Sequence, residues 1–566
     1  MKPQSLDSLF STWRLYAFML VDLCLWAFRM LADLFLDTIG LLHLPQRGRI
    51  PPVTDPLLMQ PATVLTERIR KGEVKSETLV SAYIDRIKVV NPLVNAMVSD
   101  CFEEALAEAR ALDVRIQAAL ASPATADQSV LSLPLLGIPF SIKECISVRG
   151  QPCSAGLYSR RHIRMEEDAP AVKSLRDAGA IILGVTNVPE FLLWYVSALA
   201  WGLIWLLNVV FLCRWDTNNR LYGRTNNPYD LSRISGGSSG GEAALMSAGG
   251  SLVGMGSDIG GSIRIPSFFN GVFGHKPSSD IVPCTGNYPY CGHPEREKFL
   301  VLGPIVRYPV DLKLIMRTIV HPHLLPTLRF DEPVDLRRSK FHFLTSDGDP
   351  MKTPVCPDVV EGIERARQCL RDHGCATFDA DLPLLRHSFY MWLTALSDMD
   401  SPKLAAEVME RKGELNGWLE LLKSMTVGSH FRKITCLNVI LENAVYSQST
   451  RQWPVFRRVV ERCQTLKRQL ESLLDDDAIL ILPTLPEKAP KHNGTFLRMN
   501  NCGYTAIFNI MELPVTQVTL GLGRRTGMPV GFQVVGRRLN DRLTIATAEL
   551  LAKRFDGWTP PFKVNL

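Results

Sequence analysis

Two serines stand in the most glycine-dense stretch of the chain, about a hundred residues after a lysine that ends an apolar run. Ser238 lies in Ser-Gly-Gly-Ser-Ser-Gly-Gly, and Ser262 lies 24 positions later in Gly-Ser-Asp-Ile-Gly-Gly-Ser-Ile-Arg. A serine hydroxyl is a poor nucleophile until a neighbouring base takes its proton. Lys143 is the best candidate for that base. Serine with lysine, and without a paired histidine, indicates an unusual hydrolase.

The residues before Lys143 predict a poorly solvated position for its ammonium group. Leu133–Ile142 is a nearly continuous apolar run and predicts a buried strand. Burial disfavours the charged form of lysine, so the neutral amine becomes available as a base. A lysine after a strand is more often a surface residue with a buried stem, and it is the nearby serine cluster that favours the catalytic interpretation.

Glycines beside each serine permit backbone conformations that other residues avoid. They leave successive N–H groups unobstructed, so one loop could present several donors to a developing negative oxygen, as an oxyanion hole does. The candidate donors are the backbone N–H groups of Ile259, Gly260, Gly261 and Ser262. Around Ser238 they permit a strained or cis peptide, which would let its hydroxyl bridge between Lys143 and the nucleophile. The patterned apolar segments 243–246 and 252–255 argue against a flexible linker.

Over residues 235–278 the chain resembles the amidase signature family through a long and specific motif. The matching segments are Gly-Gly-Ser-Ser-Gly-Gly-Glu, Gly-Ser-Asp-Ile-Gly-Gly-Ser-Ile-Arg-Ile-Pro and Gly-Val-Phe-Gly-His-Lys-Pro-Ser. The resemblance implies a Ser–cis-Ser–Lys triad, with Ser262 as the nucleophile, Ser238 as the proton-bridging serine and Lys143 as the initial base. It extends from about Pro56 to the C-terminus.

Within this family the chain is most similar to the vertebrate fatty-acid amide hydrolases. The similarity implies a membrane-associated serine amidase that hydrolyses primary fatty-acid amides and N-acylethanolamines through an acyl-enzyme on Ser262. The implied fold is α/β, with one large catalytic domain at 51–566, in which helices cover a mixed, twisted central sheet, and an N-terminal membrane anchor at 1–50. The partners implied are a lipid amide substrate and membrane lipid, with a homodimer as one possible assembly. The location implied is a membrane, either an endomembrane or a lipid droplet.

Three rival interpretations use the same residues. Gly236–Gly240 formally fits the Gly-x-Ser-x-Gly elbow of α/β-hydrolases, but the polar, turn-like residues 227–235 stand where that elbow requires a strand. A transamidase subunit that acts on tRNA-linked glutamate would share the triad, but it has no reason for a membrane anchor. A catalytically impaired membrane scaffold, or a mispredicted isoform, would keep the same fold. The intact set of Lys143, Ser238 and Ser262 argues against decay of the site.

Length and composition bound the remaining possibilities. The chain has 566 residues, 46% of them hydrophobic, so it can bury a large core. Its net charge of +6 is spread along the chain, which predicts no nucleic-acid partner. Its 13 cysteines are odd in number and include no Cys-x-x-Cys pair, which argues against a disulfide framework and a zinc site. We therefore predict no metal and no cofactor.

Alternating helical and strand patterns support the α/β class. Residues 76–90 predict a helix that ends at Asn91-Pro92. The inward face of this helix is Val80, Tyr83, Ile84 and Ile87. A long amphipathic helix starts near Pro454, and residues 478–482 follow it as a buried strand.

The N-terminal segment 15–44 is strongly apolar but carries a polar stripe. Asp22, Arg29, Asp33 and Asp37 lie within about 80° of one another on a helix. The helix either spans the bilayer with this stripe against another helix, or lies in the interface with its apolar face in lipid. A cleavable signal peptide is less favoured, because the apolar run is interrupted and no small-x-small site follows it.

One segment departs from the family. Phe191–Cys213 contains no charge over 23 residues, which is typical of a transmembrane helix. A span here would separate Lys143 from the two serines, so we expect none. We expect instead an insertion of about 20 residues at 196–215. It is either a retained in-frame intron or a hydrophobic hairpin that dips into the membrane beside the site; a length in whole codons and a first valine favour the former.

Overall fold

The computed structural model describes residues 31, 49–122, 127–193, 215–290, 294–397, 403–445, 454–495 and 498–565. The predicted anchor at 1–50 lies outside them except for residues 31, 49 and 50, and the predicted insertion at 196–215 lies outside them except for Trp215. Within these ranges no helix combines the length and the hydropathy that crossing a membrane requires.

A mixed sheet of 11 strands runs through the described part of the chain. Its order is β1-β3-β2-β8-β10-β9-β14-β15-β13-β11-β12. The strands are β1 (Met97–Asp100), β2 (Pro139–Lys143), β3 (Ile181–Thr186), β8 (Val253–Asp258), β9 (Phe273–Lys276), β10 (Val301–Val306), β11 (Lys340–Phe343), β12 (Ala376–Asp379), β13 (Ala478–Leu482), β14 (Val515–Leu522) and β15 (Pro529–Gly536). β2 pairs in parallel with β3 and β8, and β11 with β12 and β13, while the other neighbours are antiparallel. The predicted α/β class with a mixed sheet is confirmed.

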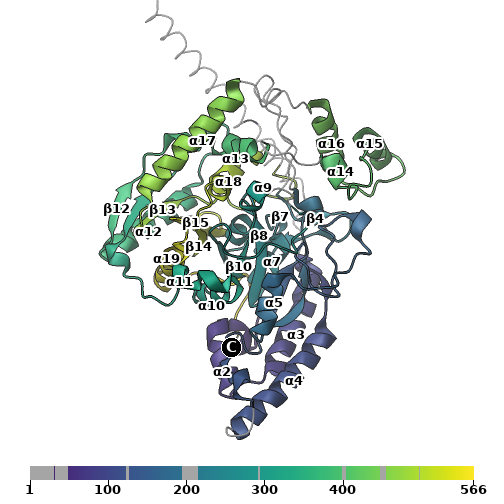
Figure 1. Ribbon diagram of the computed structural model, residues 1–566, viewed down its shortest axis with the longest axis vertical. Coiled ribbons are helices and arrows are strands. Elements are labelled where there is room, and N and C mark those ends of the chain that lie inside the picture. The colour runs from purple at the N-terminus through teal and green to yellow at the C-terminus, as the bar shows by residue number, and fades with distance from the viewer. Residues whose placement is uncertain are drawn as a thin grey trace, which may run out of the picture.

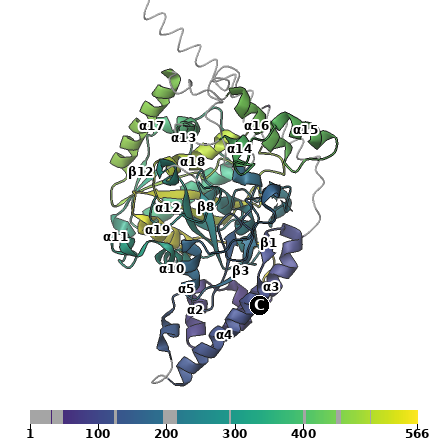
Figure 2. The ribbon, with the colours of Figure 1, turned by 45° about the vertical axis from the view of Figure 1, so that its right-hand side comes forward.

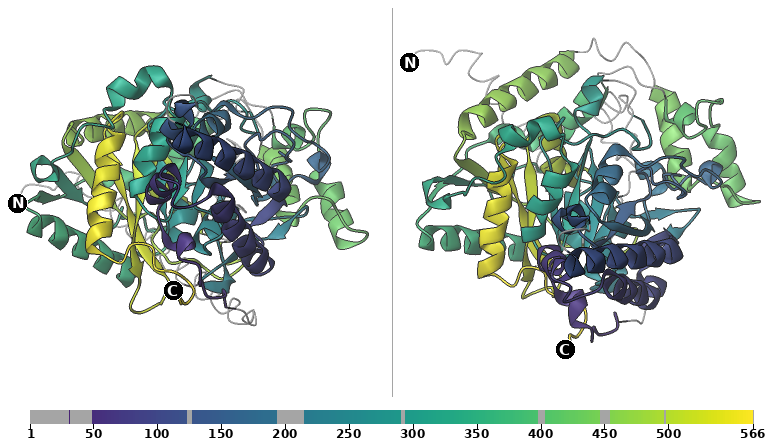
Figure 3. Two further views of the ribbon diagram at one scale, coloured as in Figure 1. Left: turned by 90° about the horizontal axis from the view of Figure 1, so that it is seen from below. Right: turned by 60° about the horizontal axis from the view of Figure 1, so that its bottom comes forward.

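Helices cover this sheet (Figure 1). They are α2 (Ala62–Arg70), α3 (Ser76–Val94), α4 (Phe102–Ala121), α5 (Pro170–Asp177), α7 (Gly240–Ser247), α8 (Arg264–Phe269), α9 (Pro294–Glu297), α10 (Val310–Ile319), α11 (Leu325–Leu328), α12 (Pro357–Asp372), α13 (Ser388–Ser397), α14 (Leu404–Glu407), α15 (Gly417–Met425), α16 (Lys433–Val445), α17 (Pro454–Leu473), α18 (Gly503–Ile510) and α19 (Asp541–Arg554). Figure 3 shows α19 alongside the strands β14 and β15. A large cluster of buried apolar side chains extends from Ile50 to Leu551, as expected for one domain.

Two predicted element boundaries need correction. α3 does not stop before Pro92 but continues to Val94, where Asn95 closes it at φ 48°. The predicted inward face of α3 is buried as expected. The apolar run that begins at Leu133 becomes a strand only from Pro139, because a turn with Gly137 at φ +72° precedes it.

The turn-like segment before Ser238 contains short strands. β6 (Asn226–Asn227) and β7 (Asp230–Ile234) pair with each other, and β4 (Asn218–Asn219) pairs with β5 (Gly223–Arg224). These pairs form sheets of their own, apart from the 11-stranded sheet. Ser238 therefore does not follow a strand of the central sheet, as a nucleophile elbow would require.

Helices α14–α16 project from one side of the molecule in both Figure 1 and Figure 2. Nearer the centre, β2 and β8 are parallel neighbours, with Ile142 paired to Met255. Their carboxyl ends therefore lie at the same edge of the sheet, which brings Lys143 close to the residues that follow β8.

Candidate active site

The Lys143 side chain is fully buried at the end of β2, and its ammonium group lies between two serines. Nζ donates to Ser238 Oγ at 2.7 Å and to Ser257 Oγ at 2.8 Å, with the Ser257 carbonyl 3.3 Å away. Lys143 and Ser238 are 95 positions apart in the chain. Adjacent parallel strands and the glycine loop thus bring together the two residues that sequence reasoning paired.

Ser238 follows a cis peptide bond from Gly237, and neighbouring backbone contacts fix its loop. Thr217 Oγ1 donates to the Gly236 carbonyl at 2.8 Å on one side of the serine. On the other side, the Ser239 N–H donates to the Ser262 carbonyl at 3.2 Å. The two serine loops are therefore directly connected, and Ser262 is half-buried where Ser238 is buried.

Burial lowers the pKa of Lys143 below its ordinary value, although Cys145, Asp258 and Glu242 act in the opposite direction. Burial also raises the pKa of the Glu242 carboxyl to about 7, against hydrogen bonds from Ser141 and Thr186. The site therefore holds a lysine biased toward the neutral amine, as predicted from its apolar approach.

Asp258 and Arg264 form a fully buried ion pair behind Ser262, with Arg264 Nη2 2.9 Å from Asp258 Oδ1. Asp258 also accepts the Gly261 N–H at 2.8 Å and the Ile263 N–H at 3.0 Å. The two charged residues therefore brace the backbone of the loop. The Gly261 N–H, which we expected among the oxyanion donors, is thus already bonded to a carboxylate.

Two helices that are distant in the sequence hold the carbonyl groups of the same loop. Trp392 Nε1 on α13 donates to the Ile259 carbonyl at 2.9 Å. Thr505 Oγ1 on α18 donates to the Gly260 carbonyl at 2.7 Å. Two successive carbonyl groups of the loop are therefore held, and the orientation of its N–H groups is fixed before any substrate arrives.

Sequence reasoning missed Ser257, Trp392 and Thr505. Ser257 precedes Asp258 inside the signature motif, so its position was a usable signal. Trp392 and Thr505 lie 133 and 245 positions from the carbonyl groups that they hold, and no local pattern points to either contact.

The described residues on either side of the predicted insertion flank the cis peptide. A Cβ on Gly237 would lie 3.1 Å from the Trp215 carbonyl oxygen and 3.2 Å from Pro189 Cγ. Trp215 itself is buried, with its ring 6.4 Å from that of Phe269. Pro189, before the predicted insertion, and Trp215, at its end, therefore both lie beside the Gly237–Ser238 peptide.

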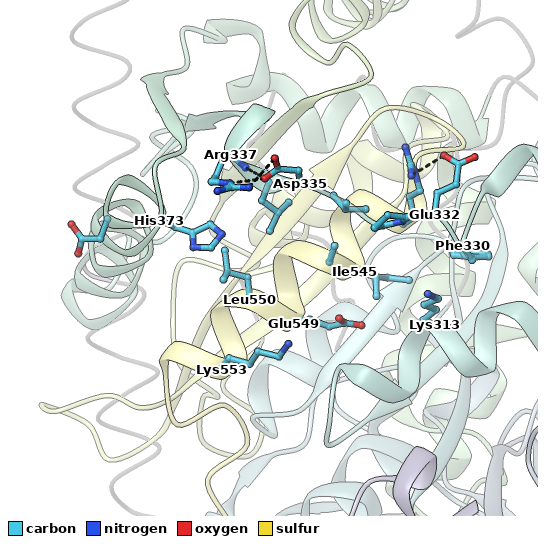
Figure 4. Close-up of a pocket in the computed structure, with 16 residues that line it drawn as sticks. Lys313, Phe330, Glu332, Asp335, Arg337, His373, Ile545, Glu549, Leu550 and Lys553 are labelled. Atoms are coloured by element: carbon cyan, nitrogen blue, oxygen red, sulfur yellow. Dashed lines mark hydrogen bonds and ion pairs between the residues drawn. The ribbon is translucent and has the colours of Figure 1, made fainter. Parts of the chain in front are cut away.

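A pocket of about 600 Å³ lies elsewhere, between α10 and α19 (Figure 4). It is lined by Lys313, Glu332, Arg337, His373, Glu549 and Lys553 among others. None of the three predicted catalytic residues borders it. Its lining includes both acidic and basic side chains, and some of them form ion pairs, as Arg337 does with Asp335 at 2.9 Å.

The comparisons with known proteins identify an amide hydrolase. The model of the amidase family matches residues 78–200 and 209–545. The chain therefore belongs to the amidase family, and it is an enzyme that hydrolyses amides. The unmatched residues 201–208 fall inside the predicted insertion.

The relatives narrow the resemblance to one branch of the family. Fatty-acid amide hydrolase 2-A of Danio rerio is 40% identical over 530 residues, which is 92% of this chain and 93% of the relative. Fatty-acid amide hydrolase 2 of Homo sapiens is 36% identical over 518 residues, 90% of this chain and 92% of the relative. The expected similarity to the vertebrate fatty-acid amide hydrolases is confirmed, and both of these relatives are of type 2. A solved fatty acid amide hydrolase shares the fold with a TM-score of 0.67 at 21% identity, over 89% of this chain and 86% of that one.

Proposed function

We propose that this amidase cleaves its substrate through an acyl-enzyme on Ser262, with Lys143 as the base and Ser238 as the proton relay. The observation that carries the proposal is the 2.7 Å hydrogen bond between the buried Lys143 Nζ and Ser238 Oγ. A lysine that is desolvated and held against a hydroxyl group is an activated base. The backbone connection from Ser239 to Ser262 supports the second half of the relay.

The proposed reaction conserves every proton. Ser262 Oγ attacks the amide carbonyl carbon, its proton passes to Ser238 Oγ, and the Ser238 proton passes to neutral Lys143. The oxyanion forms against the N–H groups of Ile259, Gly260 and Ser262. When the C–N bond breaks, the proton returns through Ser238 to the leaving nitrogen. Water then attacks the acyl-enzyme by the same relay and releases the free acid.

Labelling with a fluorophosphonate probe tests this assignment. The full chain, extracted in detergent, is labelled at neutral pH and the modified peptide is mapped. We expect an adduct on Ser262 that is lost in Lys143→Ala. An adduct on Ser238 would overturn the assignment of the nucleophile. No adduct on the wild type would favour the catalytically impaired scaffold.

We propose fatty-acid amides, both primary amides and N-acylethanolamines, as the substrate class. Similarity to the two fatty-acid amide hydrolases over nine-tenths of the chain supports this class. Hydrolysis of oleamide and of an N-acylethanolamine, compared with glutamine-derived amides, separates it from the amidotransferase alternative. Turnover of a glutamine-type amide alone would contradict the proposal.

We propose further that the enzyme takes its substrate from a membrane, to which it binds through an exposed apolar surface on α15. Large apolar side chains are exposed there, with Trp418 at 69%, Leu422 at 55% and Met425 at 63%. They are spaced by four and three positions, so they share one face of the helix, and Val427 follows at 85%. An apolar face of this kind is typical of an interaction site, and an apolar substrate dissolves in lipid.

Binding to lipid vesicles tests the α15 surface. The double variant Trp418→Ser with Leu422→Ser should lower the vesicle partition coefficient about 10-fold or more, because two large apolar side chains no longer enter lipid. Val114→Ser is the matched control, since Val114 is 68% exposed on α4, outside this surface. Equal partition of all three proteins would contradict a membrane role for α15.

The N-terminal segment 15–44 supports a second membrane contact by its composition. Together, the two contacts are our proposal for attachment to an endomembrane or a lipid droplet. A homodimer remains a prediction from the family resemblance, and the mass of the detergent-solubilised particle measures it.

A further inference from the structure

We propose that Lys352 is a positioning residue for the loop Ile259–Ser262 and acts through the first turns of α13 and α18. The inference rests on the proposed function, in which this loop stabilises the oxyanion. Lys352 lies between β11 and α12, outside every motif that the sequence analysis used. Its side chain is only 1% exposed, so it is a buried cation that the proposed reaction does not use.

Lys352 contacts the starts of both helices at once. Its Nζ donates to the hydroxyl of Ser388, the first residue of α13, at 2.9 Å. The same ammonium lies 5.0 Å from the ring centroid of Tyr504, the second residue of α18. A Cβ on Gly503 would come within 2.6 Å of Ser388 Oγ and 2.9 Å of Lys352 Nζ, so the three groups are in close contact.

Acidic partners fix the ammonium in this position. Lys352 forms an ion pair with Asp347, and Asp349 Oδ2 lies 3.6 Å away. The Asp347 N–H donates to the Tyr504 hydroxyl at 3.2 Å, which ties the same segment to α18 a second time. A buried ion pair adds little net stability compared with an apolar packing, so conformational specificity is a physical reason for its presence.

The first turns of α13 and α18, which Lys352 contacts, carry or adjoin the two side chains that donate to the carbonyl groups of the loop Ile259–Ser262. Trp392 is four positions, or about one helical turn, after Ser388 and donates to the Ile259 carbonyl. Thr505 directly follows Tyr504 and donates to the Gly260 carbonyl. Figure 1 shows α13 and α18 side by side. Because one turn of helix is rigid, a shift of either helix start displaces the carbonyl clamp and reorients the N–H groups.

Kinetic constants normalised to the number of active sites test the positioning role of Lys352. For wild type, Lys352→Met and Ser388→Ala, one aliquot is titrated to completion with the fluorophosphonate, which counts functional sites, and a separate unlabelled aliquot is assayed on a fatty-acid amide. We expect kcat per site to fall about 10- to 100-fold in Lys352→Met and about 3-fold in Ser388→Ala, since small misplacements of transition-state donors are costly. KM should stay within about twofold and the pH midpoint should not move, because the contacts of Lys143 are intact.

A control variant and a second readout make the outcomes distinct. Lys340→Met makes the same change at an exposed lysine paired with Asp475 at 2.7 Å, and kcat per site should be unchanged. Hydrogen exchange of the peptide containing 259–263 should be faster in Lys352→Met than in Lys340→Met. This readout does not need activity, so it tests the inference even where wild type proves inactive and the proposed function fails.

Two results would overturn the positioning role. One is a lower count of active sites with unchanged kcat per site, which would mean that Lys352 serves stability alone. The other is a raised KM with unchanged kcat, which would place Lys352 in substrate binding. If Lys352→Met does not fold, Ser388→Ala decides by the same criteria, because it keeps the ion pair and removes only the link to α13.

Discussion

The buried pair of Arg264 and Asp258 gives the sharpest prediction of stability. Arg264 donates to both oxygens of Asp258, at 2.9 and 3.1 Å. It also donates to the Thr505 carbonyl at 2.8 Å, to Gln533 Oε1 at 3.1 Å and to Asn509 Oδ1 at 2.7 Å. Arg264→Met keeps most of the volume of the side chain but leaves a fully buried carboxylate without its cation.

The expected cost follows from this burial. Removing one partner of a buried ion pair costs about 3–5 kcal/mol. A chain of 566 residues has an unfolding entropy near 1.2 kcal/mol/K, so the melting temperature should fall by about 2.5–4 °C. Differential scanning calorimetry at neutral pH measures this shift. Arg317→Met is the control, because that arginine pairs with Asp331 at the surface, and its shift should stay below about 1 °C.

The difference in melting temperature between wild type and Arg264→Met should become smaller as the pH falls from about 7.5 to 5.5. Burial alone raises the pKa of Asp258, and the charge and hydrogen bonds of Arg264 outweigh that effect and hold it well below its usual range. Without Arg264 the burial effect is still opposed by backbone N–H donors and the charge of Lys276, but the largest opposing effect is lost, so the pKa of Asp258 rises and the folded variant takes up a proton that the unfolded chain does not. Acid therefore stabilises the variant relative to wild type.

Lys276 changes the difference in melting temperature between wild type and Arg264→Met in the same direction. Burial, with the charge of Arg264, lowers the pKa of Lys276 to about 7 in the wild type. Wild type gains stability as the pH rises and Lys276 loses its proton near neutral pH. Losing Arg264 raises the pKa of Lys276, so the variant does not gain this stability over the same pH range. A fall in melting temperature below about 1 °C for Arg264→Met would refute the role of the Arg264–Asp258 pair in bracing the loop. A difference from wild type that stays constant with pH would refute it too.

Three further predictions concern catalysis. Since burial lowers the pKa of Lys143, kcat/KM of wild type should rise with pH at values below the ordinary lysine range. Lys143→Ala should lose this rise and about 10²–10⁴-fold in rate; a retained pH profile would exclude Lys143 as the base. Gly261→Ala puts a Cβ 2.3 Å from Thr505 Oγ1 at φ +123°, so kcat per titrated site should fall about 10²–10³-fold, and a normal kcat would show that the loop is not the oxyanion site. Ser257→Ala removes an acceptor 2.8 Å from the ammonium, which should move the pH midpoint of kcat/KM lower; an upward shift would contradict this contact.

The motif residues were predictable because strand and loop geometry is local. An apolar run before Lys143 and a glycine loop around Ser238 indicate a buried strand end and an unusual peptide, and the structure has both. Their 2.7 Å contact was expected through the family resemblance and not from spacing alone. The helix that starts at Pro454 and the strand β13 were predictable from periodicity for the same local reason.

The boundaries and the supporting contacts were not predictable in this way. Pro92 was expected to end α3, but a proline in the last turn forgoes a single helical hydrogen bond, and Asn91 completes the end by accepting the N–H groups of Ala96 and Met97 at 2.8 Å. Lys352 resembles any polar loop lysine in the sequence. Its burial depends on α13 and α18, which only the folded chain brings to it.

The glycines of the proposed oxyanion loop, residues 259–262, show what a sequence motif leaves undetermined. We interpreted Gly260 and Gly261 as sources of backbone freedom, which Gly261 uses at φ +123°, and the structure also leaves little room for a side chain at either position. A Cβ on Gly260 would lie 2.9 Å from Trp392 Cζ2, so the indole that clamps the loop also excludes a side chain there. Since the peptide unit is planar, a fixed Gly260 carbonyl turns the Gly261 N–H the opposite way, and that N–H is the one that Asp258 accepts. These glycines therefore also serve close packing against two distant helices.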